Sequence, residues 1–204
     1  MKVSTMSGHV WHDWPSRDEI DPHGSVVTMG VFDGFHRGHQ ALARRAVGHG
    51  ARLRLPTLLV TFDPHPMLVT CPERAPRALL DVDDRVDLAL AHGVDGVVVL
   101  PFTKATAATP AESFVADGLV ARLGVRSLVV GSNFKCGRAG AGDVDYLRAA
   151  GAWHGFRVDA LDLVRVGERT CSSTEVRRLL ADGDVDAAAQ LLGRRDPRLS
   201  AVAV

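Results

Sequence analysis

Apolar runs rich in β-branched residues alternate with segments of helical periodicity along this chain. Short continuous apolar runs are typical of strands that are buried on both faces of a sheet. They predict strands over residues 25–31, 57–62, 96–100, 127–131 and 156–164. Helical spacing and capping signals predict helices over 38–50, 83–93, 143–151, 173–181 and 185–192, and one more that opens at Thr109-Pro-Ala-Glu112. This alternation predicts an α/β fold with a five-stranded parallel sheet and helices on both of its faces.

The same pattern indicates a single domain over residues 1–193, while 194–204 shows no clear signal and is expected to be a flexible tail. The formal net charge is zero, and no apolar run approaches the length of a membrane span. We therefore expect a soluble cytoplasmic protein without a nucleic-acid or membrane partner, and the oligomeric state stays open. Cys71, Cys136 and Cys171 lie far apart, which argues against a disulfide framework or a structural zinc site.

The loop after the first predicted strand carries residues suited to binding phosphate. It reads Gly30-Val-Phe-Asp-Gly-Phe-His-Arg-Gly-His-Gln40. His36 and His39 are three residues apart at the start of a predicted helix, so they share one face. A helix N-terminus offers free N–H groups and partial positive charge to an anion, and Gly38 lets a ligand approach the backbone. A plain turn with two surface histidines is the alternative, but it explains less of this pattern.

A second signal precedes a late helix and reads Cys171-Ser-Ser-Thr-Glu-Val-Arg177. Ser172 and Glu175 have the spacing of a capping box. Ser173 and Arg177 are four residues apart, so both face the same side and could hold phosphate oxygens. Taken alone, the segment favours a capped helix with a solvated arginine; together with the histidine loop, it favours a phosphate site.

Together these motifs resemble those of the nucleotidylyltransferase superfamily that includes the HIGH-type aminoacyl-tRNA synthetases. More closely, the chain is similar to the FMN adenylyltransferase (FAD synthetase) module of bacterial bifunctional riboflavin kinase/FAD synthetases. The resemblance runs from about Val26 to Gly193. It also includes Thr61-Phe-Asp-Pro-His-Pro66, Leu100-Pro-Phe-Thr103, Val130-Gly-Ser-Asn-Phe-Lys-Cys-Gly-Arg138 and Gly183-Asp-Val-Asp-Ala-Ala-Ala-Gln-Leu-Leu-Gly193.

The resemblance implies a Rossmann-like fold and transfer of AMP from ATP to FMN, which gives FAD and pyrophosphate. It implies catalytic roles for His36, His39 and Arg177. It places the nucleotide against Gly30, Phe32, Asp33, Gly38, Asn133, Ser172, Ser173 and Thr174, and the acceptor against Phe62, Asp63, His65 and Pro66. Mg²⁺ is expected to be bound mainly through the nucleotide phosphates, with no dedicated protein cage.

The match departs from the family pattern in two places. The segment 194–204 is too short for a riboflavin kinase domain, so that activity is expected to be absent. Asn133 and Cys136 stand where Asp (or Asn) and Phe are common, which leaves the acceptor less certain than the chemistry. One alternative is therefore a nucleotidylyltransferase that uses ATP or CTP and another phosphorylated metabolite. A catalytically silent nucleotide or flavin sensor is a second alternative.

Two loops also keep alternatives open. The loop around His65 either borders the acceptor or is a rigid turn with a hydrogen-bonded histidine. The glycine-rich stretch 137–142 is either a flap that closes over a ligand or a flexible turn.

Overall fold

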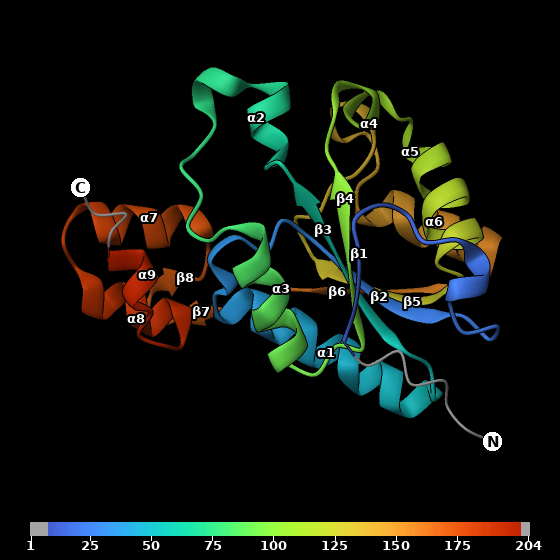
Figure 1. Ribbon diagram of the computed structural model, residues 1–204, viewed down its shortest axis with the longest axis horizontal. Coiled ribbons are helices and arrows are strands. Elements are labelled where there is room, and N and C mark those ends of the chain that lie inside the picture. Colours follow the sequence, from blue (N-terminus) through green and yellow to red (C-terminus); the bar gives the residue numbers. More distant parts are fainter. Residues whose placement is uncertain (1–7, 201–204) are drawn as a thin grey trace.

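The computed structural model describes residues 8–200, which form a parallel sheet between two layers of helices (Figure 1). Within this part of the chain the main sheet has six strands in the order β1-β4-β3-β2-β5-β6. Their bounds are β1 (His9–Trp11), β2 (Ser25–Met29), β3 (Thr57–Asp63), β4 (Gly96–Pro101), β5 (Val125–Gly131) and β6 (Arg157–Leu161). A separate antiparallel pair, β7 (Arg165–Val166) and β8 (Arg169–Thr170), follows β6. The α/β class and the parallel sheet are confirmed.

Helices follow most strands. Their bounds are α1 (Arg37–Leu53), α2 (Pro66–Thr70), α3 (Val82–Ala91), α4 (Lys104–Ala108), α5 (Ala111–Ser113), α6 (Val144–His154), α7 (Ser173–Ala181), α8 (Val185–Leu192) and α9 (Pro197–Ser200). A π-helical segment, Phe114–Arg122, continues α5. Short 3₁₀ turns lie at Arg17–Glu19, Asp33–Phe35, Pro72–Arg74 and Arg138–Gly140. The predicted bounds of the last two long helices, 173–181 and 185–192, match α7 and α8.

The expected count of five strands was wrong, because the edge strand β1 was not foreseen. It has three residues, His-Val-Trp, which is too short for an alternating pattern to stand out. It pairs in parallel with β4, with His9 opposite Gly96. A Cβ atom at Gly96 would lie 2.7 Å from the Trp11 ring, so the bare glycine gives the tryptophan room to cover the sheet edge.

The helix expected to open at Thr109 begins two residues later, at Ala111. The Thr109 hydroxyl donates a hydrogen bond to the carbonyl of Ala105, 3.2 Å away, and therefore closes α4 instead of capping the next helix. The short helix α4 was itself missed. Thr103 caps it by accepting a hydrogen bond from the N–H of Thr106 at 3.1 Å.

The segment from residue 194, which was expected to be a flexible tail, contacts the core in the part that the structure describes. Arg194 donates hydrogen bonds to the carbonyls of Gly34 and Phe35, at 3.0 and 3.1 Å. Leu199, on α9, is 1% exposed. These contacts hold the segment against the loop that precedes α1. Residues 201–204 lie outside the described part of the chain.

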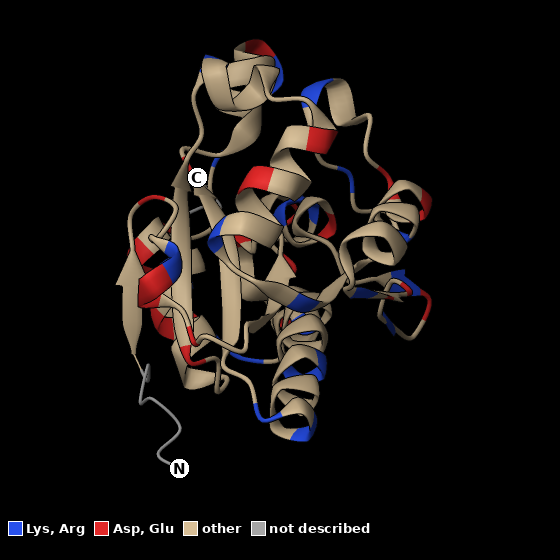
Figure 2. Ribbon diagram, turned by 90° about the vertical axis from the view of Figure 1, so that its right-hand side faces the viewer, with Lys and Arg blue, Asp and Glu red and all other residues tan. Residues whose placement is uncertain are grey.

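Each face of the sheet buries its own apolar core. On one face, Leu58 and Val60 of β3 and their neighbours pack against α6 and the π-helical segment. On the other, Leu59 of β3 packs with residues of α1, α3, α7 and α8. Burial on both faces explains why the strands are continuously apolar. Charges of both signs are spread over the helices and loops (Figure 2). Across residues 8–200, no helix combines the length and apolar character needed to cross a membrane.

Candidate active site

Two adjoining cavities lie at the carboxyl ends of the strands, where parallel sheets bind ligands. One, of about 340 Å³, is lined largely by the loop after β2 and by the start of α7. The other, of about 510 Å³, is lined mainly by apolar and aromatic side chains. They share Gly30, Val31, Asn133 and Phe134 as lining residues. We call them the polar cavity and the aromatic cavity.

The two histidines of the first motif meet in the polar cavity. His36 is the N-cap residue of α1 and His39 lies one turn later, so their rings stack with centroids 3.7 Å apart and an angle of 20°. Gly38 makes this possible, since a Cβ atom there would lie only 3.0 Å from the His36 ring. The glycine therefore serves the histidine pair as well as opening the backbone to the cavity.

Both imidazoles are neutral in the folded protein at pH 7. Burial lowers the pKa of His36 to about 4, helped by the positive charge of Arg194. Burial also lowers the pKa of His39 well below its ordinary value, and His36 and Arg85 act in the same direction. Neutral imidazoles still donate one N–H hydrogen bond each. The pair therefore offers a phosphate oriented hydrogen-bond donors rather than two full charges.

Neither histidine has a partner for its buried Nδ1 atom among the described residues. An unsatisfied buried nitrogen costs free energy and is rare in folded proteins. Such groups tend to persist where function requires them, so this cost fits a binding site better than a structural turn.

The start of α7 faces the same cavity. Ser172 caps the helix by accepting a hydrogen bond from the N–H of Glu175 at 3.1 Å, as its spacing predicted. The Ser173 hydroxyl donates a hydrogen bond to the carbonyl of Asp33 at 2.8 Å. This bond ties the start of α7 to the loop before α1. The two helix beginnings that the sequence singled out are thus held together, and Thr174 lines the cavity beside them.

Arg177 lines the polar cavity but is already engaged. Its guanidinium donates to the carboxylate of Asp33, and its Nε donates to the carbonyl of Arg77 at 2.7 Å. Asp33 is 2% exposed and also accepts hydrogen bonds from the N–H groups of Leu79 and Leu80, at 2.9 and 3.0 Å. Asp33 thus joins three segments: the loop before α1, the stretch before α3, and α7.

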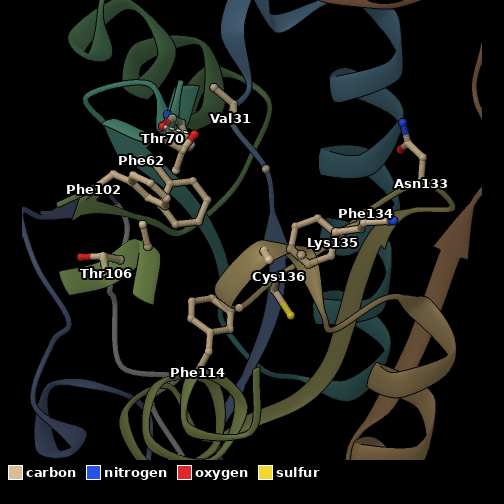
Figure 3. Close-up of a pocket in the computed structure, with 16 residues that line it drawn as sticks. Val31, Phe62, Thr70, Phe102, Thr106, Phe114, Asn133, Phe134, Lys135 and Cys136 are labelled. Atoms are coloured by element: carbon tan, nitrogen blue, oxygen red, sulfur yellow. Dashed lines mark hydrogen bonds between the residues drawn. The ribbon is translucent and has the colours of Figure 1, made fainter. Parts of the chain in front are cut away.

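The aromatic cavity is built from several separate elements (Figure 3). Phe62 and Phe102 lie on one side with their rings 5.6 Å apart and nearly perpendicular, and Phe134 lies across from them. Phe114 and Cys136 complete the apolar lining. Burial raises the pKa of the Cys136 thiol to about 11, so the sulfur is a neutral, apolar part of the wall at pH 7. The cavity suits a flat apolar ring system.

Three predicted site residues lie elsewhere than expected. Phe32 is fully buried and lines neither cavity. Its ring packs against the ring of His39, with centroids 5.0 Å apart. Asp63 is exposed and lines neither cavity. His65 lines the polar cavity instead of the aromatic one, and its Nδ1 accepts a hydrogen bond from the N–H of Met67 at 3.1 Å. Phe62 and Pro66 do line the aromatic cavity.

The glycine-rich stretch 137–142 forms part of the aromatic cavity wall. Gly137 has a φ of 71°, and a Cβ atom there would lie 2.5 Å from the backbone of Ala111. Cys136 and Gly142 exchange two backbone hydrogen bonds, at 2.8 and 2.9 Å. The stretch is thus anchored at both ends in this conformation.

Sequence reasoning missed Arg85, whose guanidinium binds backbone carbonyls of two residues that line the cavities, Val31 and Phe62. This α3 side chain is 5% exposed and donates to the carbonyls of Val31 and Phe62, at 2.9 and 3.1 Å, and to the Thr61 hydroxyl at 3.2 Å. One planar guanidinium therefore fixes the ends of β2 and β3 relative to each other. The available signal was a charged residue directly beside Val86, on the buried side of a predicted helix.

Comparisons with known proteins place this geometry in context. A family model described as FAD synthetase matches residues 18–175. The bifunctional riboflavin kinase/FMN adenylyltransferase of Pseudomonas fluorescens is 42% identical over 84% of this chain and 55% of its own length. The protein of the same name from Escherichia coli K12 is 36% identical over 83% of this chain and 54% of its own length. The chain thus spans about half the length of these relatives.

A solved structure has a similar fold. It is described as a macrolide-efflux protein from Streptococcus pneumoniae, and it superposes with a TM-score of 0.77 at 25% sequence identity. The similarity covers 91% of this chain and 62% of the other. The fold similarity therefore extends over most of this chain.

Proposed function

The chain belongs to the FAD synthetase family, and from this we propose that it transfers AMP from ATP to FMN, giving FAD and pyrophosphate. The relatives that carry FMN adenylyltransferase in their names are about twice as long, so the activity of this chain rests on its own site. What carries the proposal is the pair of adjoining cavities, one polar and one aromatic, that share Gly30 and Val31 among their lining residues.

The two substrates divide between the cavities according to their chemistry. The triphosphate of ATP lies in the polar cavity, where the starts of α1 and α7 present backbone N–H groups and Arg177 supplies a positive charge. The isoalloxazine ring of FMN lies among Phe62, Phe102 and Phe134, because flat aromatic surfaces stack and exclude water. The FMN phosphate then lies where the two cavities meet, beside Gly30 and Val31. A volume of about 510 Å³ is within the usual range for a site that buries such a ligand.

The reaction requires positioning more than proton transfer. The FMN phosphate has a second pKa near about 6, so it is mostly a dianion at neutral pH and needs no strong general base. One of its oxygens attacks the α-phosphorus of ATP, the bond to the β-phosphate oxygen breaks, and pyrophosphate leaves with the electron pair. His36 and His39 donate hydrogen bonds to the phosphate oxygens, on which negative charge spreads in the transition state.

Mg²⁺ would be held mainly by the nucleotide phosphates and not by protein carboxylates. Asp33, an acidic side chain in the polar cavity, already has its carboxylate bonded to two backbone N–H groups and to Arg177. That leaves it poorly disposed to bind a metal directly. The metal would neutralise charge on the phosphates and keep several waters.

A product assay tests the proposal. Purified protein is incubated with Mg²⁺, FMN and either ATP or CTP, and flavins are separated by chromatography while pyrophosphate is measured enzymatically. We expect FAD and pyrophosphate in equal amounts from ATP. If pyrophosphate is released only when a different phosphorylated acceptor is present, that acceptor, and not FMN, is the substrate. Nucleotide binding without turnover, across a panel of acceptors, would show a binding protein instead of an enzyme.

A further inference from the structure

One arginine lines the polar cavity, and its guanidinium is already paired with a carboxylate that lines the same cavity. Arg177 is the single Lys or Arg among the described residues that line this cavity. Its guanidinium is shared between Asp33 and the carbonyl of Arg77. A triphosphate that enters must therefore compete with Asp33 for the cation it needs.

Asp33 keeps other partners when Arg177 leaves. Its carboxylate also accepts hydrogen bonds from the N–H groups of Leu79 and Leu80. These bonds come from the backbone of the stretch before α3 and do not depend on the position of Arg177. The buried carboxylate is therefore never left without hydrogen-bond donors, which lowers the cost of releasing the arginine.

From this geometry we infer that Asp33 is a positioning residue that pairs with Arg177 before ATP binds. When ATP binds, the nucleotide phosphates replace Asp33 as the partner of the Arg177 guanidinium. The inference rests on the proposed function, because it assigns the order of events within the same site. Before binding, Asp33 keeps Arg177 in the ion pair seen in the structure. The exchange also releases the carbonyl of Arg77, so it loosens the connection between α7 and the stretch before α3.

The exchange has a measurable cost in affinity. When a binding-competent arrangement is populated only part of the time, the apparent Kd rises by the inverse of that fraction. Replacing Asp33 with asparagine removes the negative charge, while the amide oxygen still accepts from Leu79 and Leu80. If Arg177 is free about a tenth of the time, Asp33→Asn tightens ATP binding about tenfold.

The test is a double-mutant cycle on the full chain, read by isothermal titration calorimetry with MgATP in the absence of FMN. We expect Asp33→Asn to bind about tenfold more tightly than the parent, and to gain nothing when Arg177→Met is already present. Asp162→Asn is the matched control, because Asp162 lines the same cavity and the described contacts of Arg177 are made with Asp33 and Arg77. Its effect on the Kd should be much smaller.

Several outcomes would overturn the inference. Equal or weaker ATP binding by a folded Asp33→Asn variant would make Asp33 a simple anchor. An equal gain with Met at position 177 would show direct repulsion of phosphates instead of an effect through the arginine. If the parent protein binds no MgATP, the proposed function is rejected as well. If the parent binds MgATP but Asp33→Asn changes the Kd equally with and without Arg177, only the inference is rejected.

Kinetics and a measurement on the unmodified protein complete the test. In Asp33→Asn, the KM for ATP should fall while kcat does not rise, because a freed Arg177 binds substrate and pyrophosphate alike. In the parent, the Nε–H signal of Arg177 in NMR spectra, assigned by its loss in Arg177→Lys, should shift on saturation with MgATP. The amide signals of Leu79 and Leu80 should keep their protection from exchange. An unmoved Arg177 signal at saturation would overturn the exchange even if the asparagine variant failed to fold.

Discussion

At the scale of single residues, the stacked histidines have the most direct part in the proposed chemistry. Replacing either His36 or His39 with alanine removes one donor from the phosphate site. A lost donor of this kind typically slows an enzyme by about 10²- to 10³-fold. We expect such a loss in kcat for FAD formation. His12→Ala serves as the control, since His12 is exposed and lines neither cavity. Near-normal turnover of a folded double variant would remove the pair from the mechanism.

The same pair should make stability depend on pH. Both pKa values are lowered in the folded state, to about 4 for His36, while an unfolded histidine titrates near about 6.5. The unfolded chain therefore takes up protons first as the pH falls. The free energy of unfolding should be unaffected by the pair above about pH 6.5 and should decrease below it, by up to about 1.4 kcal/mol per pH unit for each histidine. Urea denaturation at several pH values between 7 and 4.5 gives the free energy of unfolding at each pH. This free energy should fall less steeply with decreasing pH for His36→Gln than for the parent. Equal slopes would contradict the assignment.

Sequence predicted the residues whose role depends on local spacing and missed those whose role depends on the assembled fold. His36, Gly38 and Ser172 could be located because helix geometry alone brings their groups together. Arg85 could not, since its partners lie in the loop after β2 and at the end of β3, and both precede it by more than twenty residues. Phe32, which was expected to contact the nucleotide, is buried in the core, and its backbone is left-handed, with a φ of 54°; spacing along the sequence does not predict this conformation.

At the scale of elements, the cap of α7 links helix stability to the site. Ser172→Ala removes a hydrogen-bonded N-cap and should lower the free energy of unfolding by about 1 kcal/mol. Ser172→Asn should restore most of that loss, because asparagine caps helices as well as serine does. Urea denaturation without ligands measures both. Equal losses in the two variants would indicate that packing, not capping, fixes Ser172.

Long elements with strong periodicity were predicted well, and short ones were not. The central strands and the helices α7 and α8 have enough residues for a pattern to show. The elements β1, α2, α4 and α9 have three to five residues each, and tertiary contacts determine them. Trp11 over Gly96, for example, stabilises β1 through a neighbour that is remote in sequence.

At the scale of the whole molecule, the two cavities should be separable by mutation. Phe102→Ala removes a wall of the aromatic cavity and should raise the KM for FMN about tenfold, with the ATP affinity unchanged. Arg177→Ala should do the reverse, weakening ATP use with an intact fold. Steady-state kinetics with each substrate varied in turn will show this crossed pattern. A parallel rise of both KM values in each variant would contradict the division of substrates.

The strand order has a final consequence for how this protein can be monitored. The chain passes from β2 to β3 and β4 on one side and then returns to β5 and β6 on the other, so the switch point of the sheet lies between β2 and β5. The binding cleft opens at this switch point, between segments separated by about half the sequence. A bound nucleotide should therefore protect the amides at the carboxyl ends of β2 and β5 from hydrogen exchange at the same time. Nucleotide affinity then measures whether both halves of the sheet are folded.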